Sequence, residues 1–364
     1  MRPPPAGVLP APLYILEEGQ VVKIEVDGVS KTTLTNEPSI GGGALAIVGL
    51  SVSPLDSALA YVIQVAEGNT LVLTDANGEN RRALLENVSV SQPHWSPDGS
   101  AIAVAIWESQ EGDSVWDGGI WTVSAISGEA RLLLANDPYP QNPETEAWGY
   151  SPLAWSPDGS KLLLGRYSLT VETGDVAILD VASGALTLFQ PPADAAQHLR
   201  VGSSGGLWTP DGNAVHAILH SPGLAPPEPG AYLADATNGM LTPTIPTRNA
   251  AGQFIVVQSQ FYGADGAHYA LISEVDQLLA PGEDPAAGPP EVALYRIGAD
   301  GTRTAVHDQR FALFGRPTPA PDGSGILIPT ATPEYDVSYW YVPIEGEATE
   351  VTFAPTADVY WGNP

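Results

Sequence analysis

One tetrapeptide returns along this chain about every fifty residues, and its composition is that of a tight turn. The full copies are Ser96-Pro97-Asp98-Gly99, Ser156-Pro157-Asp158-Gly159, Thr209-Pro210-Asp211-Gly212 and Ala320-Pro321-Asp322-Gly323. Proline sets φ for the second position of a type I turn, aspartate tolerates the third, and glycine closes the turn where φ must be positive. Because an apolar run follows each copy, the motif predicts a repeated hairpin between two strands.

Weaker copies of the motif fill the gaps in this period. They are Ser53-Pro54-Leu55-Asp56, Gly263-Ala264-Asp265-Gly266 and Trp361-Gly362-Asn363-Pro364. The second residues of all copies are then 43, 60, 53, 54, 57 and 42 positions apart. Repetition at this period, with short strands and no helical pattern, is typical of a propeller or a solenoid. We therefore predict an all-β propeller of four-stranded antiparallel blades, seven in number, with six blades as the alternative.

The two ends of the chain complement each other. After the last motif there is no room for further strands, so Asp358 to Trp361 is predicted to be an innermost strand without a blade. The segment from Leu13 to Thr35 supplies three strands that lack such a partner. Since an open strand edge invites aggregation, we expect the termini to pair and close the ring. Residues 13–364 then form a single domain, and residues 1–12 a proline-rich tether.

Three of the full motifs follow a tryptophan, namely Trp95, Trp155 and Trp208. These segments resemble the W-S-P-D-G signature of the TolB-like (WD40-like repeat) β-propeller family, and the resemblance covers nearly the whole chain from about Leu13. It implies that each signature lies between the first and second strands of a blade, with the tryptophans packed between blades. Family propellers serve as periplasmic interaction platforms, as substrate-gating domains of peptidases and as uncharacterised surface proteins. The resemblance therefore specifies the fold more narrowly than the function.

Charge and cysteine content exclude several classes of function. The chain has 42 acidic and 14 basic residues, a net charge of −28, so it repels phosphate backbones and anionic membranes. We expect no nucleic-acid partner and no membrane insertion. The absence of cysteine excludes disulfides and Cys-ligated metals. Acidic surfaces are common in secreted or salt-exposed proteins, which favours an extracytoplasmic location, secreted, periplasmic or tethered at the cell surface, with the export signal outside this chain.

Connection lengths divide the predicted ring into two faces. Turns between strands one and two, and between strands three and four, are short in every blade, whereas the long connections share the opposite face. The longest are Glu108 to Gly118, Asn136 to Gly149, Ser221 to Gly230 and Glu274 to Glu291. Long loops on a rigid scaffold are usually functional or disordered. We call this side the long-loop face and predict that it binds a partner.

Candidate binding residues lie on this face and at the mouth of the central channel. Trp116 and Trp148 stand in insertions without an equivalent elsewhere in the repeat, so they either cap the core or form a platform for a sugar or a partner side chain. The residues expected where innermost strands begin are Tyr150, His198, Arg200, Gln258, Phe314, Arg316 and Asp358. Arg200 and Arg316 either clamp a ligand carboxylate or pair with nearby acidic residues.

Catalytic and metal-binding patterns are weak. The segment 202–206 matches G-x-S-x-G around Ser204, but a nucleophile elbow needs a helix after it, and here the strand ending at Trp208 follows. On a strand, His216 and His220 would stand about 13 Å apart, too far to share a zinc ion. His94 and the motif aspartates are interpreted as structural. We expect no catalytic residue, cofactor or metal.

The sequence therefore favours a non-catalytic recognition or assembly module that binds a protein partner. A carbohydrate-binding or carbohydrate-active propeller that uses the central channel is the alternative. A propeller hydrolase is a third possibility, and it would need a metal-binding cluster of carboxylates and asparagines in the channel.

Overall fold

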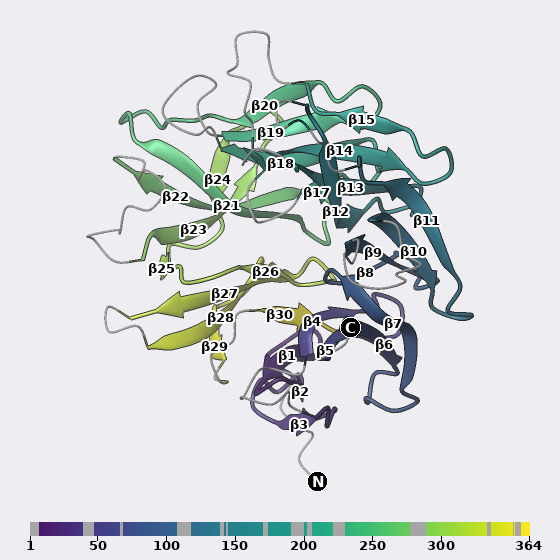
Figure 1. Cartoon of the computed structure of the whole chain (residues 1–364). Helices are drawn as coiled ribbons and strands as arrows, with labels where there is room; N and C mark the ends of the chain where they lie inside the picture. The colour runs from purple at the N-terminus through teal and green to yellow at the C-terminus, as the bar shows by residue number, and fades with distance from the viewer. Residues whose placement is uncertain are drawn as a thin grey trace.

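Strands are the only regular secondary structure in the part of the chain that the structure describes, and they surround a common centre (Figure 1). The computed structural model describes residues 7–38, 47–65, 68–107, 118–138, 142, 145–169, 174–190, 200–201, 206–220, 230–276, 289–332, 336–351, 353 and 358–364. Within these residues, hydrogen bonds join the strands into six antiparallel sheets. The chain is an all-β propeller with four-stranded antiparallel blades, as the repeat predicts.

Four of the sheets are single blades whose strands run in chain order from the centre outwards. One contains β12 (Trp148–Trp155), β13 (Lys161–Ser168), β14 (Gly174–Asp180) and β15 (Leu186–Leu188). A second contains β26 (Thr318–Pro319), β27 (Gly325–Ala331), β28 (Val337–Pro343) and β29 (Thr349–Val351). The other two sheets each have one additional short strand. The first of these contains β16 (Arg200–Val201), β17 (Leu207–Trp208), β18 (Ala214–His220), β19 (Gly230–Asp235) and β20 (Leu241–Ile245). The second contains β21 (Phe254–Tyr262), β22 (His268–Val275), β23 (Glu291–Ile297), β24 (Arg303–Ala305) and β25 (Phe311–Ala312).

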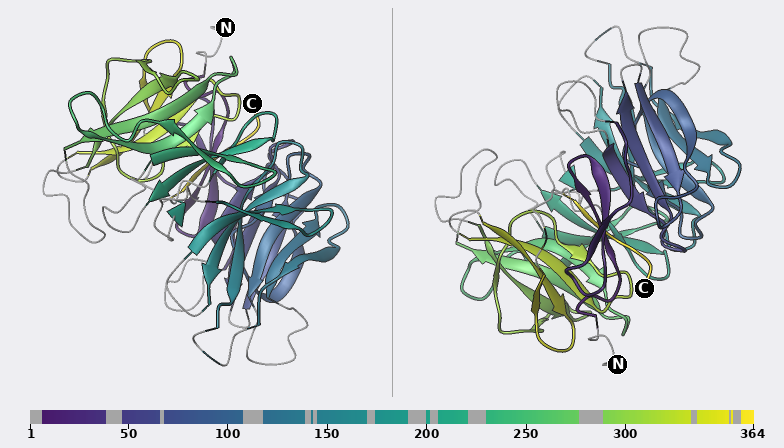
Figure 2. Two further views of the ribbon diagram at one scale, coloured as in Figure 1. Left: turned by 90° about the horizontal axis from the view of Figure 1, so that it is seen from above. Right: turned by 90° about the horizontal axis from the view of Figure 1, so that it is seen from below.

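A fifth blade combines the two ends of the chain. Its strands, from the centre outwards, are β30 (Val359–Trp361), β1 (Leu13–Glu17), β2 (Gln20–Ile24) and β3 (Lys31–Thr33). β30 runs antiparallel to β1, with Leu13 opposite Trp361. The purple and yellow strands lie side by side in Figure 1 and in both views of Figure 2. The predicted pairing of the termini is confirmed. Of the predicted tether, Leu9 (3% exposed) packs against this blade, and Ala11 is buried.

The sixth sheet has eight strands because two four-strand meanders join at their edges. Its strands are β4 (Ile47–Val52), β5 (Leu59–Val65), β6 (Gly68–Thr74), β7 (Arg82–Val90), β8 (His94–Trp95), β9 (Ala101–Trp107), β10 (Gly119–Ser124) and β11 (Ala130–Ala135). β7 is the outermost strand of the first meander, and its last residues, Ser89 and Val90, pair with β9 of the second. Whether this sheet counts as one blade or two decides the number of blades.

The Pro-Asp-Gly motif forms the turn between the first two strands of a blade, as predicted. In one copy, Asp158 Oδ1 accepts hydrogen bonds from Ser156 Oγ (2.7 Å) and from the Ser160 N–H (3.0 Å). These bonds lower the pKa of Asp158 to about 2. Gly159 has a φ of +70°, which L side chains rarely adopt. The same conformation recurs at the motif glycines Gly99, Gly212 and Gly323.

Apolar packing between neighbouring sheets forms the core, and the motif tryptophans cross these interfaces. Leu13 and Ile15 of β1, for example, pack with Leu327 and Tyr339 of the sheet that precedes β30. Each motif tryptophan donates its indole N–H to a backbone carbonyl of the previous innermost segment. The bonds run from Trp95 to Ser51 (3.3 Å), Trp155 to His94 (3.0 Å), Trp208 to Ala154 (3.3 Å) and Trp361 to Thr318 (3.1 Å). The packing role predicted for the motif tryptophans is confirmed.

Candidate functional site

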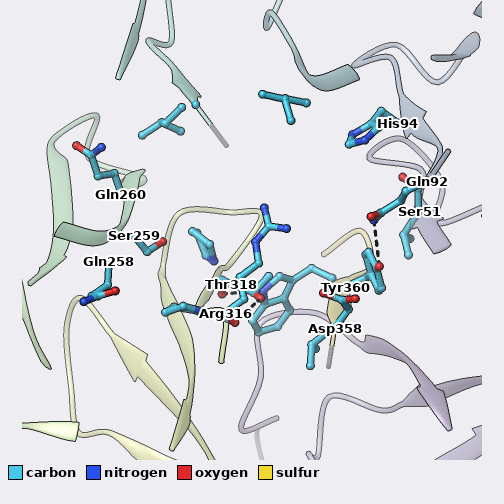
Figure 3. Close-up of a pocket in the computed structure, with 18 of the residues that line it drawn as sticks. Ser51, Gln92, His94, Gln258, Ser259, Gln260, Arg316, Thr318, Asp358 and Tyr360 are labelled. Atoms are coloured by element: carbon cyan, nitrogen blue, oxygen red, sulfur yellow. Dashed lines mark hydrogen bonds between the residues drawn. The ribbon is translucent and has the colours of Figure 1, made fainter. Parts of the chain in front are cut away.

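The innermost segments of the ring surround a central cavity of about 400 Å³ (Figure 3). The segments that line it are 51–52, 92–94, 153, 206–207, 258–260, 316–319 and 358–361. Each of these segments lies in or beside the first strand of a four-strand unit, and Ile218 of β18 completes the lining. A cavity of this size is in the range of small-ligand sites. It has room for a side chain or a chain end but not for a folded domain.

Arg316 is the one Lys or Arg among the described residues that line the cavity. Its side chain is exposed, and Figure 3 shows the guanidinium reaching into the cavity. Among the ion pairs between described residues, none includes Arg316, whereas Arg81 and Arg166 hold carboxylates at 2.7 and 2.9 Å. Asp358 lines the same cavity, so the site also contains one carboxylate. A guanidinium in this state is available to an anionic ligand.

Tyr360 of β30 adds a neutral hydrogen-bonding group. Gln92 Nε2 donates to the Tyr360 hydroxyl at 3.0 Å and to the backbone carbonyl of Leu50 at 3.1 Å. Burial, followed by the negative charge of Asp358, raises the pKa of Tyr360. The phenol is therefore protonated at neutral pH, and its O–H is a donor.

His94, which the sequence suggested to be structural, also lines the cavity (Figure 3). Burial, followed by the positive charge of Arg316, lowers the pKa of His94 to about 4. The imidazole is thus neutral at pH 7. A neutral imidazole can donate one hydrogen bond and accept another, and it adds no second positive charge to the site.

Gln258 and Gln260 bring two amides to the cavity wall from β21. Gln258 Nε2 donates to Ser273 Oγ at 3.2 Å, and Gln260 Oε1 lies 3.0 Å from His268 Nε2. The His268 ring stacks on His216 of the preceding blade, with 4.1 Å between ring centroids. Sequence reasoning compared His216 with His220 and missed this pair, because the two rings come from different blades and no local pattern relates them.

Trp148 and Tyr150 contribute mainly to the core on the long-loop side. Tyr150 is 6% exposed, and burial raises the pKa of its hydroxyl. Trp148 is half-buried, and the Arg166 guanidinium lies 3.5 Å from its ring centroid. Arg166 also pairs with Asp175 at 2.9 Å. One face of Trp148 is therefore covered by a cation within the protein.

The structure brings three predicted site residues, Gln258, Arg316 and Asp358, to one cavity. Phe314 is 43% exposed shortly before the Arg316 segment. Trp116 and His198 lie outside the described residues, as do Ser204 and the side chain of Arg200. So do most of the predicted long connections, including 108–117, 221–229 and 277–288.

Chemically, the cavity combines one cation, Arg316, and one carboxylate, Asp358, with neutral donors and acceptors. Its hydrogen-bonding groups include the His94 imidazole, the Tyr360 phenol and the glutamine amides. No three His, Asp or Glu side chains in the described part of the chain are placed to hold a metal ion. The arrangement can therefore pair with an anionic group and orient it by hydrogen bonds.

The sequence matches no protein-family model and no curated protein. Solved structures nonetheless resemble the fold. Prolyl oligopeptidase B from Galerina marginata is 10% identical with a TM-score of 0.61, over 96% of this chain and 52% of that chain. Oligogalacturonate lyase from Vibrio parahaemolyticus is 12% identical with a TM-score of 0.58, over 91% and 81%. TolB from Acinetobacter baumannii is 15% identical with a TM-score of 0.46, over 94% and 77%.

The first two likenesses show the β-propeller fold. This chain spans about half the length of the prolyl oligopeptidase chain. Among the described residues, no helix has the length and apolar character needed to cross a membrane. Because one fold serves many chemistries, function depends on the side chains of the site.

Proposed function

We propose that the ring has seven blades, with the eight-stranded sheet counted as two. The hydrogen bond from Trp95 to Ser51 joins the two meanders of that sheet. It is equivalent to the bonds from Trp155 and Trp208, which join neighbouring innermost segments elsewhere in the ring. The same contact thus recurs inside the eight-stranded sheet, which supports a blade boundary there.

This propeller acts as a non-catalytic recognition module outside the cytoplasm, and it binds a protein partner through the long-loop face and the channel mouth. The observation that carries this proposal is the polar central cavity with the exposed guanidinium of Arg316, which forms no ion pair with another described residue. The net charge of −28 supports the location, since such surfaces suit secreted proteins. The residues that the sequence assigns to binding are Trp116, Trp148, Tyr150, His198, Arg200, Gln258, Phe314, Arg316 and Asp358. Of these, Tyr150 is buried and contributes to packing beneath the proposed surface.

A carbohydrate ligand in the same cavity is the second candidate. Trp361, Gln92 and Gln258 line the wall, and an aromatic ring beside amide groups suits a sugar, which has an apolar face and many hydroxyls. Saturable binding of a neutral oligosaccharide from a glycan panel, lost on Trp361→Ala, would favour this candidate over the first.

Site-specific photo-crosslinking tests the protein-binding proposal. A photoreactive phenylalanine analogue replaces Phe314 (43% exposed) near the channel mouth or, as a control, Leu55 (59% exposed) in a tight turn of the opposite face. We expect one protein of the native cell envelope to crosslink from position 314 and not from position 55. Crosslinking from position 55 alone would show that the partner binds the face with the tight turns, which would contradict the proposal.

The captured partner then serves for affinity measurements. The double variant Trp148→Ala/Arg316→Ala should weaken binding of that partner at least tenfold, about 1.4 kcal/mol. Aromatic and arginine side chains often dominate binding energy, which is why this pair is chosen. Unchanged affinity in the double variant, at an unchanged melting temperature, would contradict the proposed site.

A further inference from the structure

Positive charge is scarce in this chain, and several of its basic side chains are neutralised by ion pairs. There are 14 basic residues against 42 acidic ones. Lys31, Arg81 and Arg166 each hold a carboxylate within 2.9 Å. Arg316 differs, because it lines a cavity and takes part in none of the ion pairs between described residues. An arginine stays charged in any environment, so it creates a local attraction for anions on a protein that otherwise repels them.

The groups beside Arg316 are suited to a ligand that accepts hydrogen bonds. The Tyr360 oxygen already accepts a bond from Gln92 at 3.0 Å. The hydrogen of that hydroxyl has no acceptor among the hydrogen bonds of the described residues, so it is available to a ligand oxygen. His94 is neutral because burial and the charge of Arg316 both lower its pKa. The cavity therefore offers one positive charge with neutral hydrogen-bonding groups beside it, and one carboxylate, Asp358, elsewhere in its lining.

We propose that this cavity is a carboxylate-binding site, in which Arg316 holds the acidic end of a flexible segment of the partner and Tyr360 donates a hydrogen bond to it. The planar guanidinium presents two parallel N–H groups that match the two oxygens of a carboxylate. The cavity of about 400 Å³ admits an acidic side chain or a C-terminal residue. The inference rests on the proposed recognition function and names the group that the partner inserts.

A small dicarboxylate tests the site without knowledge of the partner. The full chain is titrated with glutarate and with glutaramide, its neutral diamide, while the indole N–H resonance of Trp361 on the cavity wall is followed by NMR. We expect glutarate to shift this resonance saturably and glutaramide to leave it in place. Equal effects of the two compounds would overturn the proposal, and so would tighter binding of inorganic phosphate than of glutarate.

Matched variants separate the cavity from the overall charge. Arg316→Gln should weaken glutarate binding at least tenfold. Arg310→Gln removes the same charge from an exposed position that does not line the cavity, and it should change the affinity less than twofold. Equal loss in both variants would mean that net charge alone controls binding and would overturn the site.

Asp358→Asn supplies a second variant in case Arg316→Gln does not fold. Asp358 lines the same cavity and repels an incoming anion, so its neutralisation should tighten glutarate binding two- to fivefold. Weaker binding in this variant would contradict the proposal. If the captured partner binds but glutarate does not, the carboxylate site is wrong and the recognition function stands. If glutarate binds and no partner crosslinks, the carboxylate site stands and the protein-recognition function is wrong.

Discussion

Two neutral histidines stacked between neighbouring blades make this fold sensitive to acid at the scale of single residues. His216 lies 4.1 Å from His268 between ring centroids, and its Nε2 is 2.8 Å from the Tyr262 hydroxyl. His216 Nδ1 is buried with no hydrogen-bond partner. Burial lowers the pKa of His216 to about 4, and burial followed by the neighbouring ring lowers that of His268 to about 3. A proton on either ring would be a buried charge, and neither ring forms an ion pair or a hydrogen bond with a carboxylate of the described residues.

We expect His216→Phe to flatten the pH dependence of stability between about pH 6.5 and pH 4. An unfolded histidine titrates near 6.5, so below that pH the unfolded chain takes up protons that the folded chain does not. The free energy of unfolding therefore falls as the pH falls through this window. Phenylalanine keeps a ring at position 216 and removes the titration, which should reduce the loss by on the order of 1–2 kcal/mol. Urea unfolding of the parent and the variant at several pH values measures this difference in the free energy of unfolding.

Tyr262→Phe is the matched control for this prediction. It removes the hydrogen bond to His216 Nε2 but leaves both histidines in place. Its free energy of unfolding should be lower at every pH, with the slope of the parent. If His216→Phe also kept the parental slope, other groups such as His94 would have to produce the pH dependence.

At the scale of strands and turns, features that arise from local chemistry were predictable. Gly159 has the positive φ that its place in the Pro-Asp-Gly motif predicts, and Trp155 crosses to the neighbouring innermost segment. Contacts that depend on how neighbouring blades pack against each other could not be predicted from the sequence. Tyr150 and Arg316 were both assigned to the starts of innermost strands, yet Tyr150 is buried in the core and Arg316 is exposed in the cavity. No local pattern specifies which way such a side chain turns.

Removal of residues 358–364 tests the strand that joins the termini. This deletion exposes the edge of β1, because β30 pairs with Leu13, Tyr14 and Ile15. It also removes the indole bond from Trp361 to the Thr318 carbonyl. We expect the melting temperature in a calorimetric scan to fall by several degrees, since loss of a partly buried strand costs more than the ~1 kcal/mol of a typical substitution.

A shorter deletion controls for the loss of the chain end itself. Removal of Asn363 and Pro364 alone breaks the Asn363 hydrogen bonds to Ser57 and Leu55 but keeps β30. This variant should melt within about 2 °C of the parent, as expected for the loss of one part-buried and one exposed hydrogen bond at the chain end. If the longer deletion melted at the same temperature as the shorter one, β30 would not stabilise the ring.

Charge balance dominates at the scale of the whole molecule. A net charge of −28 cannot be offset by the ion pairs between described residues, several of which are exposed, such as Lys31 with Glu17. Exposed pairs of this kind contribute ~1 kcal/mol or less each. Repulsion among the carboxylates is greater in the compact ring than in the unfolded chain, where the charges are farther apart. The folded protein is therefore expected to be stabilised by screening.

We expect the melting temperature at neutral pH to rise by several degrees when NaCl is increased from about 20 mM to about 500 mM, because the Debye length then falls to about 4 Å. Near the isoelectric point of about 4.2 the net charge approaches zero, so the same increase in salt should have little effect there. This comparison separates screening of repulsion from general salting-out, which would stabilise the fold at both pH values. A melting temperature that falls with salt at neutral pH would mean that ion pairs such as Arg166 with Asp175 outweigh the repulsion.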